Sequence, residues 1–80
     1  MMEREQQMEQ VCSMLMQAVR RDALPVAQLI YDTGQTEPWE WIHIIYSSKQ
    51  RQTVEITGMR MSQAIDAVWE AITGTGYGSK

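Results

Sequence analysis

The single histidine and the single cysteine of this 80-residue chain have the side chains best suited to chemistry. An imidazole can act as a general base or a metal ligand, and a thiolate can act as a nucleophile. Either role would need further ligands or reactive groups close by, and none cluster around His43 or Cys12, which lie far apart in the sequence. The sequence therefore predicts no catalytic residue, no metal site and no cofactor. A lone cysteine fits a packed thiol in a reducing compartment.

A glycine-rich stretch, GTGYGSK at residues 74–80, has the composition of a phosphate-binding loop. Such loops follow a strand and open a helix whose N-terminus meets the phosphate. Here the stretch comes after a predicted helix instead of before one. We therefore expect Gly74 to cap that helix and residues 75–80 to form a flexible tail.

The segment WEWIHIIY at residues 39–46 is apolar on both faces of a predicted strand, because alternate side chains of a strand point to opposite sides. One face carries both tryptophans and the histidine: Trp39, Trp41, His43 and Ile45. The other face is largely aliphatic: Ile42, Ile44 and Tyr46. Helices cover only one face of the sheet in a two-layer domain, so the second apolar face predicts a partner chain.

Composition and charge fit one small domain that contacts other proteins. Hydrophobic residues make up 44% of the chain, which is enough for a globular core. A core of this size gives only about 3 to 5 kcal/mol without disulfides or metals, and self-association is one remedy. Ten acidic residues against seven scattered basic ones give a formal charge of −3, so general affinity for nucleic acid is not expected.

The distribution of charged and apolar residues also predicts the cellular compartment of the protein. The first ten residues mix charges with glutamines and show no apolar leader segment. No stretch approaches the roughly 20 apolar residues needed to span a bilayer. We expect a soluble, cytoplasmic protein that is not in a membrane, and the sequence indicates no small-molecule substrate.

Two segments have helical periodicity. Residues 3–22 contain no glycine or proline, and their apolar residues recur at spacings of three and four. The predicted buried stripe consists of Met8, Val11, Cys12, Leu15, Met16, Ala18 and Val19. Met14 falls on the opposite side, where an exposed thioether could contact a partner. The second helix, at residues 60–73, buries one apolar face with Trp69 at its edge.

Three segments are predicted strands, at residues 26–32, 39–47 and 53–57. The first is ambiguous, since Val26, Leu29 and Ile30 could also lie along a short helix. The strand is favoured because a hairpin alone would be marginally stable, whereas three strands backed by helices are not. The predicted fold is therefore α+β, a two-layer α-β-β-β-α domain in which both helices cover one face of a three-stranded antiparallel meander.

The loop between the last two strands decides which face the helices cover. Residues 47–52 lack the Asn-Gly or Gly signal of a two-residue turn, which favours an odd-numbered loop of three or five residues. Such a loop would place Ile44 opposite Val54 or Ile56 and bury the aliphatic face. A loop of two or four residues would bury the aromatic face instead.

The order of these elements resembles the layout of double-stranded RNA-binding domains over residues 8–73, with a Leu24-Pro25 step before the first strand and Gly34 before the second. Members of that family grip RNA partly with a lysine cluster at the start of the last helix and a histidine between the first two strands. This chain has RMSQAID at residues 60–66 and GQTEP at residues 34–38 in those places. The resemblance extends to the layout and not to the RNA-binding residues.

These features predict a non-catalytic protein–protein interaction module that forms a homodimer, binds another protein, or does both. We expect it to be a small inhibitor, adaptor or regulator, for example one encoded by a phage or another mobile element. The predicted partner-binding residues are Trp39, Trp41, His43, Ile45 and Met14. The alternative is a nucleic-acid-binding accessory protein with a discontinuous basic patch, formed by Arg20, Arg21, Lys49, Arg51 and Arg60.

Overall fold

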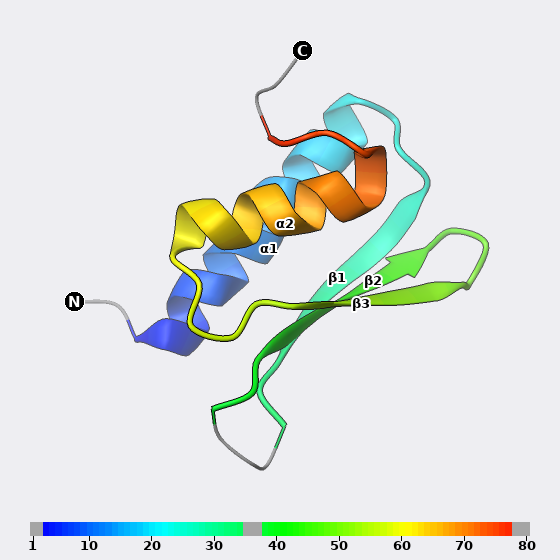
Figure 1. The fold of residues 1–80 in the computed structure, drawn as a ribbon. Coiled ribbons are helices and arrows are strands. Elements are labelled where there is room, and N and C mark those ends of the chain that lie inside the picture. The colour runs from blue at the N-terminus through cyan, green and yellow to red at the C-terminus, as the bar shows by residue number, and fades with distance from the viewer. Residues whose placement is uncertain (1–2, 35–37, 78–80) are drawn as a thin grey trace.

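Two helices pack on one face of a three-stranded antiparallel sheet in the computed structural model, which describes residues 3–34 and 38–77 (Figure 1). The elements follow one another as α1 (Arg4–Arg21), β1 (Val26–Asp32), β2 (Trp41–Tyr46), β3 (Arg51–Glu55) and α2 (Met61–Thr73). The strand order is β1-β2-β3, so β2 is central and β1 and β3 each have one free edge. The predicted α+β class and element order are confirmed.

The described residues include only part of the predicted turn and tail, because residues 35–37 and 78–80 lie outside them. Residues 75–77 are described. The Tyr77 ring packs edge to face on Trp69, with ring centres 5.4 Å apart, and the Tyr77 N–H donates to the Asp66 carboxylate over 3.2 Å. Trp69, expected at the edge of the helix face, is consequently only 7% exposed.

The end of α1 is set by two hydrogen bonds that reverse the chain. The Ala23 N–H donates to the Arg20 carbonyl over 3.2 Å, and the Leu24 N–H donates to the Val19 carbonyl over 2.9 Å. This motif needs a left-handed residue just past the helix, and Ala23 takes that conformation with a φ of 54°. The helix therefore ends before Pro25.

The core lies between the helices and the inner face of the sheet. From α1, the predicted stripe supplies buried residues: Met8, Val11, Cys12, Leu15, Ala18 and Val19. From the sheet and the segment after β3 come Val26, Leu29, Ile42, Ile44 and Ile56. From α2 come Ala64, Val68 and Trp69. Met16, also predicted in the stripe, is only partly buried.

A bulge in β1 explains why this segment was ambiguous in the sequence. The pairing with β2 shifts between Val26 and Gln28, which adds one residue to β1. Val26 and Leu29 are three residues apart, yet both point into the core, where they are 6% and 8% exposed. The bulge thus gives a strand the three-residue spacing that is otherwise typical of a helix.

A three-residue loop joins β2 to β3. The Lys49 N–H donates to the Tyr46 carbonyl over 2.8 Å, and the Tyr46 N–H donates to the Gln50 carbonyl over 2.9 Å. Residues 47–49 are left as the loop, and Lys49 is left-handed with a φ of 74°. This is the usual geometry of a three-residue hairpin loop, whose last residue is left-handed. The predicted odd-numbered loop is confirmed.

The pairing predicted for Ile44, with Val54 or Ile56, was wrong by two or four residues, although the predicted face was right. Ile44 lies opposite Gln52, and Ile42 lies opposite Val54. The loop is centred one or two residues earlier than the predicted pairings require, and an even shift preserves the face to which each side chain points. Ile42 and Ile44 are both fully buried. For the same reason β3 covers residues 51–55, two residues before the predicted strand.

The burial of α1 generates a stability prediction. Leu15 is 0% exposed and Gln17 is exposed on the same helix. We expect Leu15→Asp to cost about 3 kcal/mol or more and to unfold the protein, because it buries an unpaired carboxylate. Gln17→Asp places the same group in solvent and should be nearly silent. Thermal unfolding followed by circular dichroism checks this, and equal losses in the two variants would contradict the assignment of the stripe.

The hairpin loop generates a second prediction, in the opposite direction. Lys49 holds a left-handed conformation that costs an L-residue about 1 kcal/mol relative to glycine. Lys49→Gly should therefore raise the free energy of unfolding by up to that amount. Lys49→Ala is the matched control, since it removes the charge and keeps the Cβ atom. If both variants gained equally in urea denaturation, backbone strain at this position would not be the cause.

Candidate functional site

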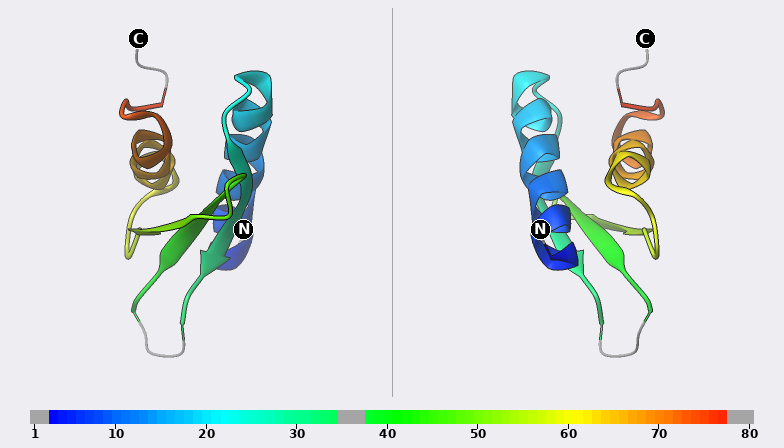
Figure 2. Two further views of the ribbon diagram at one scale, coloured as in Figure 1. Left: turned by 90° about the vertical axis from the view of Figure 1, so that its right-hand side faces the viewer. Right: turned by 90° about the vertical axis from the view of Figure 1, so that its left-hand side faces the viewer.

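The face of the sheet that points away from the helices is the candidate site, and we call it the open face. Figure 2 shows both helices on the other side of the sheet. Three rows of side chains cross the open face. The first row is Asp32, Trp41 and Glu55. The second row is Ile30, His43 and Thr53. The third row is Gln28, Ile45 and Arg51.

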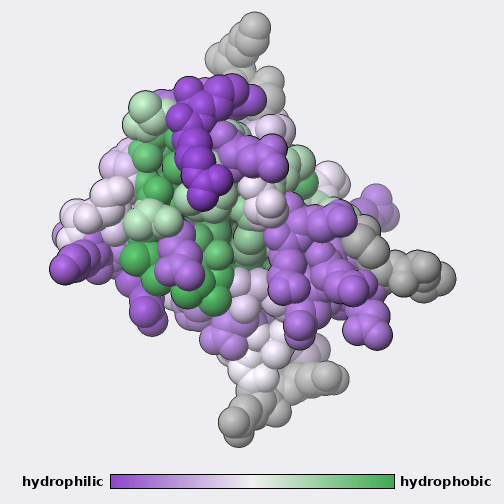
Figure 3. All heavy atoms as spheres, turned by 180° about the vertical axis from the view of Figure 1, so that it is seen from behind, coloured by the Kyte–Doolittle hydropathy of each residue, from purple (hydrophilic) through white to green (hydrophobic). Residues whose placement is uncertain are grey.

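Apolar side chains lie in all three rows of the open face, Trp41 and Ile45 on β2 in the two end rows and Ile30 on β1 in the middle row. Ile30 is 37% exposed, and Trp41 and Ile45 are partly exposed. Seen from behind, the molecule shows an apolar area on its left, the side on which the β2–β3 loop lies, framed and interrupted by hydrophilic residues (Figure 3). The structure thus places three of the predicted partner-binding residues, Trp41, His43 and Ile45, on one surface.

His43 lies at the centre of the open face and bridges all three strands. Its Nε2 atom is 3.0 Å from an Asp32 carboxylate oxygen on β1, and its Nδ1 atom is 3.0 Å from the Thr53 hydroxyl oxygen on β3. A carboxylate only accepts, so in the neutral ring Nε2 carries the proton and Nδ1 accepts from Thr53. The other Asp32 oxygen accepts the Gly34 N–H over 2.9 Å. The bonds from Gly34 and then from His43 hold the pKa of Asp32 below its usual value.

An aspartate, a histidine and a hydroxyl in a row are also the components of a nucleophilic relay. That chemistry needs, in addition, N–H donors positioned around a developing oxyanion. Thr53 instead lies in the middle of β3, exposed and directly opposite His43 in the ladder. The contacts are those of cross-strand pairs that orient a side chain. Within residues 3–34 and 38–77, no group of three or more histidine, cysteine or acidic side chains could hold a metal ion.

Trp41 is held in place by the turn that follows β1. Gly34 has a φ of +62°, and a Cβ atom on it would lie 2.8 Å from Cζ3 of the Trp41 ring. The position therefore needs glycine for two reasons, the backbone conformation and the close approach of the ring. Gly34 thus lies against the indole, and Trp41 is only partly exposed.

The other two predicted partner-binding residues lie elsewhere: the predicted grouping of Trp39 with the open face was wrong, and Met14 lies on α1, on the helix side for which it was predicted. Trp39 precedes β2, is 46% exposed, and lines a hollow with Arg4 and Tyr31 at the start of α1. The strand alternation that was used to place it ends at Trp41. Met14 lines a groove between the helices with Met61 of α2, on the layer opposite the open face.

The basic residues of the alternative nucleic-acid hypothesis are spread over the molecule. Arg20 and Arg21 end α1, and Arg60 precedes α2. Lys49 and Arg51 lie in and next to the β2–β3 loop, at the opposite end of the molecule from the start of α2 (Figure 1). Arg21 is also paired with Asp22, with 3.0 Å between the nitrogen and oxygen atoms.

The most heavily bonded charge of the described residues is the Glu40 carboxylate, which is not among the predicted site residues. Arg4 donates to both of its oxygens, over 2.7 and 3.0 Å. The Tyr31 hydroxyl and the Gly58 N–H donate to it as well, the latter over 3.0 Å. The side chain is 12% exposed. The Arg4 guanidinium above all, with these other donors, lowers the pKa of Glu40 to about 2.

Two signals in the sequence could have identified Glu40. It is in phase with Ile42 and Ile44, so its side chain belongs to the buried face and needs a partner there. Arg4 stands in the first turn of a helix, where the dipole disfavours a cation, so it too needs an anion nearby. Burial and the Glu40 charge raise the pKa of the Tyr31 hydroxyl to about 12, which keeps it a donor.

Family models, curated proteins and solved structures were compared with the chain, and none matches it. Among the described helices, none has the length and apolar character needed to cross a membrane.

The Glu40 cluster generates a prediction on pH. The folded state lowers the pKa of Glu40 from 4.5 to about 2, so its contribution is present above pH 4.5 and is lost as the pH falls towards 2. We expect this loss to be on the order of 3 kcal/mol, since the shift spans about 2.5 pKa units and one unit is about 1.4 kcal/mol. Glu40→Gln should be less stable at pH 7 and should show a flatter dependence of stability on pH over this range.

The matched control is Glu70→Gln, which removes an exposed acid from α2. It should keep the pH dependence of the parent chain. Urea denaturation at a series of pH values gives the free energies. An unchanged acid limb in Glu40→Gln would show that the cluster does not control acid stability.

Proposed function

We propose that this chain is a non-catalytic protein-interaction module that self-associates through the open face, and that it acts as a small inhibitor, adaptor or regulator. One observation supports this most strongly. The helices cover only the inner face of the sheet, while Ile30, Trp41 and Ile45 remain partly exposed across the outer one. Apolar patches of this kind on small domains are typical of protein contact.

The side chains of this face are held in position before any partner binds. Gly34 packs on the Trp41 ring, and Asp32 and Thr53 hold the His43 ring from both sides. Side chains that are already ordered lose little conformational entropy on binding. Aromatic residues in such positions commonly account for much of the binding energy of an interface.

The distribution of charge favours a second copy of the chain as the occupant. One end of the open face carries Asp32 and Glu55, and the other end carries Arg51 next to Lys49. A two-fold arrangement in which the strands of the two copies run in opposite directions brings the acidic end of each copy to the basic end of the other. The open face is thus complementary to itself.

The size of the face limits the strength of association. Three strands about 5 Å apart form a narrow surface, and small interfaces belong to weak or transient complexes. We therefore expect a reversible dimer whose population depends on protein concentration.

Trp41→Ala tests this proposal. It should weaken self-association by about 2 kcal/mol, which is roughly thirtyfold in the dissociation constant, because it truncates the large aromatic side chain of the open face. The fold should persist, since Trp41 lies outside the buried core. Sedimentation equilibrium over a range of concentrations gives the constant, and circular dichroism checks the fold.

Met14→Ala is the matched control, because Met14 is partly exposed on the helix layer. It should leave the dissociation constant unchanged. A chain that stays monomeric up to millimolar concentration would contradict self-association. An equal effect of the two variants would move the interface away from the open face, and collapse of the fold in Trp41→Ala would contradict the placement of Trp41 outside the core.

A further inference from the structure

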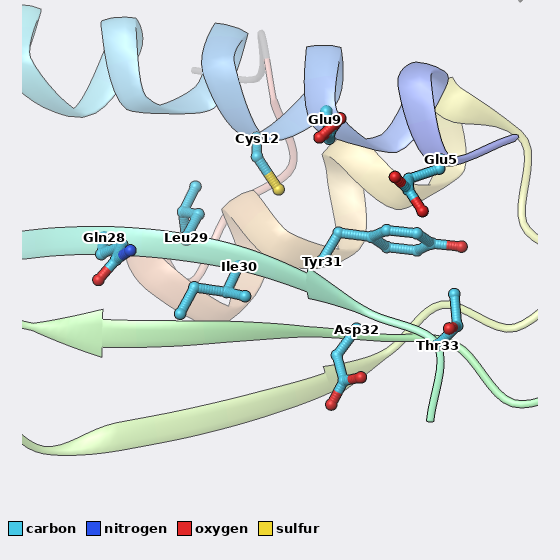
Figure 4. Close-up of a pocket in the computed structure, with 9 residues that line it drawn as sticks. All are labelled: Glu5, Glu9, Cys12, Gln28, Leu29, Ile30, Tyr31, Asp32 and Thr33. Carbon is cyan, nitrogen blue, oxygen red and sulfur yellow. The ribbon is translucent and has the colours of Figure 1, made fainter. Parts of the chain in front are cut away.

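A groove runs between α1 and the free edge of β1 (Figure 4). This is the edge of β1 that does not pair with β2. Its volume is about 540 Å³. From α1 it is lined by Glu5, Glu9 and Cys12, which are spaced as one face of a helix, and from the strand it is lined by residues 28–33. In Figure 4 the side chains of Glu5 and Cys12 point from the helix towards β1.

The strand residues that line the groove show that it follows the backbone edge. Leu29 and Tyr31 point to the inner face of the sheet, whereas Ile30 and Asp32 point to the open face. Side chains of both faces can line one groove only where that groove runs along the edge of the strand. Every second residue of an edge strand turns its N–H and C=O groups away from the sheet, where they can pair with another strand.

The edge is regular where the groove lies. The bulge of β1 falls between Val26 and Gln28, before the lining residues, and from Gln28 to Asp32 the pairing with β2 advances one residue at a time. A regular strand edge can pair with a further strand, which is how sheet edges bind extended peptides. Cys12 lies on the helix side of the groove, 8% exposed, and burial raises the pKa of its thiol to about 11, so it acts there as an apolar surface.

The charge of the groove selects the kind of segment that would fit. Its charged lining residues are all acidic: Glu5, Glu9 and Asp32. Pairing of β1 with β1 of a second copy would bring two acidic grooves together, which like-charge repulsion disfavours. A segment with lysine or arginine meets the three carboxylates instead. The groove therefore differs from the open face, whose charges complement each other.

We propose that this groove binds an extended, basic segment of a partner protein, which adds to β1 as a fourth strand alongside α1. Backbone hydrogen bonds to the β1 edge would supply affinity, and Glu5 and Glu9 would select the cationic side chains. The groove shares Gln28, Ile30 and Asp32 with the open face, whereas Trp41 and Ile45 do not line it. A change at Trp41 therefore separates peptide binding from self-association.

The experiment uses a defined probe, the peptide acetyl-Lys-Val-Lys-Val-Lys-Val-amide, titrated into the full chain labelled with nitrogen-15. We expect saturable binding and the largest amide shifts in residues 28–33. Two further peptides separate the contributions. One replaces each lysine by glutamate, and the other carries an N-methyl group on every backbone amide, so it has no N–H to donate to the edge of β1. Both should bind at least about tenfold more weakly.

Variants of the protein complete the test. The double variant Glu5→Gln with Glu9→Gln should lose at least about tenfold in affinity for the lysine peptide. Glu70→Gln, which removes an acid from α2, should bind like the parent, and so should Trp41→Ala. No binding at millimolar peptide, equal binding of the N-methylated peptide, or shifts confined to other strands would overturn the proposal. Loss of binding in Trp41→Ala would place the peptide on the open face and overturn it as well.

Discussion

The Glu40 carboxylate is the contact on which the arrangement of this domain depends. It joins the first turn of α1 through Arg4, the edge strand through Tyr31, and the connection to α2 through the Gly58 N–H. Its own backbone carbonyl accepts the Ile56 N–H over 3.0 Å, which carries the pairing with the last strand beyond the end of β3. A mostly buried carboxylate, 12% exposed, is tolerated here because its hydrogen-bond donors are in place. The same carboxylate accepts hydrogen bonds from Arg4 and Tyr31, and both of these residues line the hollow that Trp39 also lines.

Local patterns in the sequence predict most of this fold. The stripe of α1, the end of α2 at Gly74 and the alternation around Ile42 and Ile44 depend on residues close in sequence, and the structure agrees with them. Features that depend on distant residues could not be predicted in this way. The bulge in β1 is set by pairing with β2, and the register of β2 with β3 is set by where Lys49 turns the chain.

The candidate site shows the same division. Alternation along one strand places Trp41, His43 and Ile45 together, and it fails for Trp39, where the strand has not yet begun. The partners of His43 come from β1 and β3, and only the cross-strand register brings Asp32 and Thr53 to it. The groove at the edge of β1 has no signal in the sequence, since its acidic residues come from a helix and a strand that the fold alone brings together.

The pair of Arg4 and Glu40 spans 36 positions of the chain, and this separation bears on the order of folding. Closing so long a segment costs entropy that a nearby contact does not. The hairpin of β2 and β3, closed by three residues, and the local hydrogen bonds at the end of α1 require no such closure. The first turn of α1 is therefore the part expected to dock last, after the rate-limiting barrier. Loss of its ion pair would then appear as faster unfolding, with the rate of folding little changed.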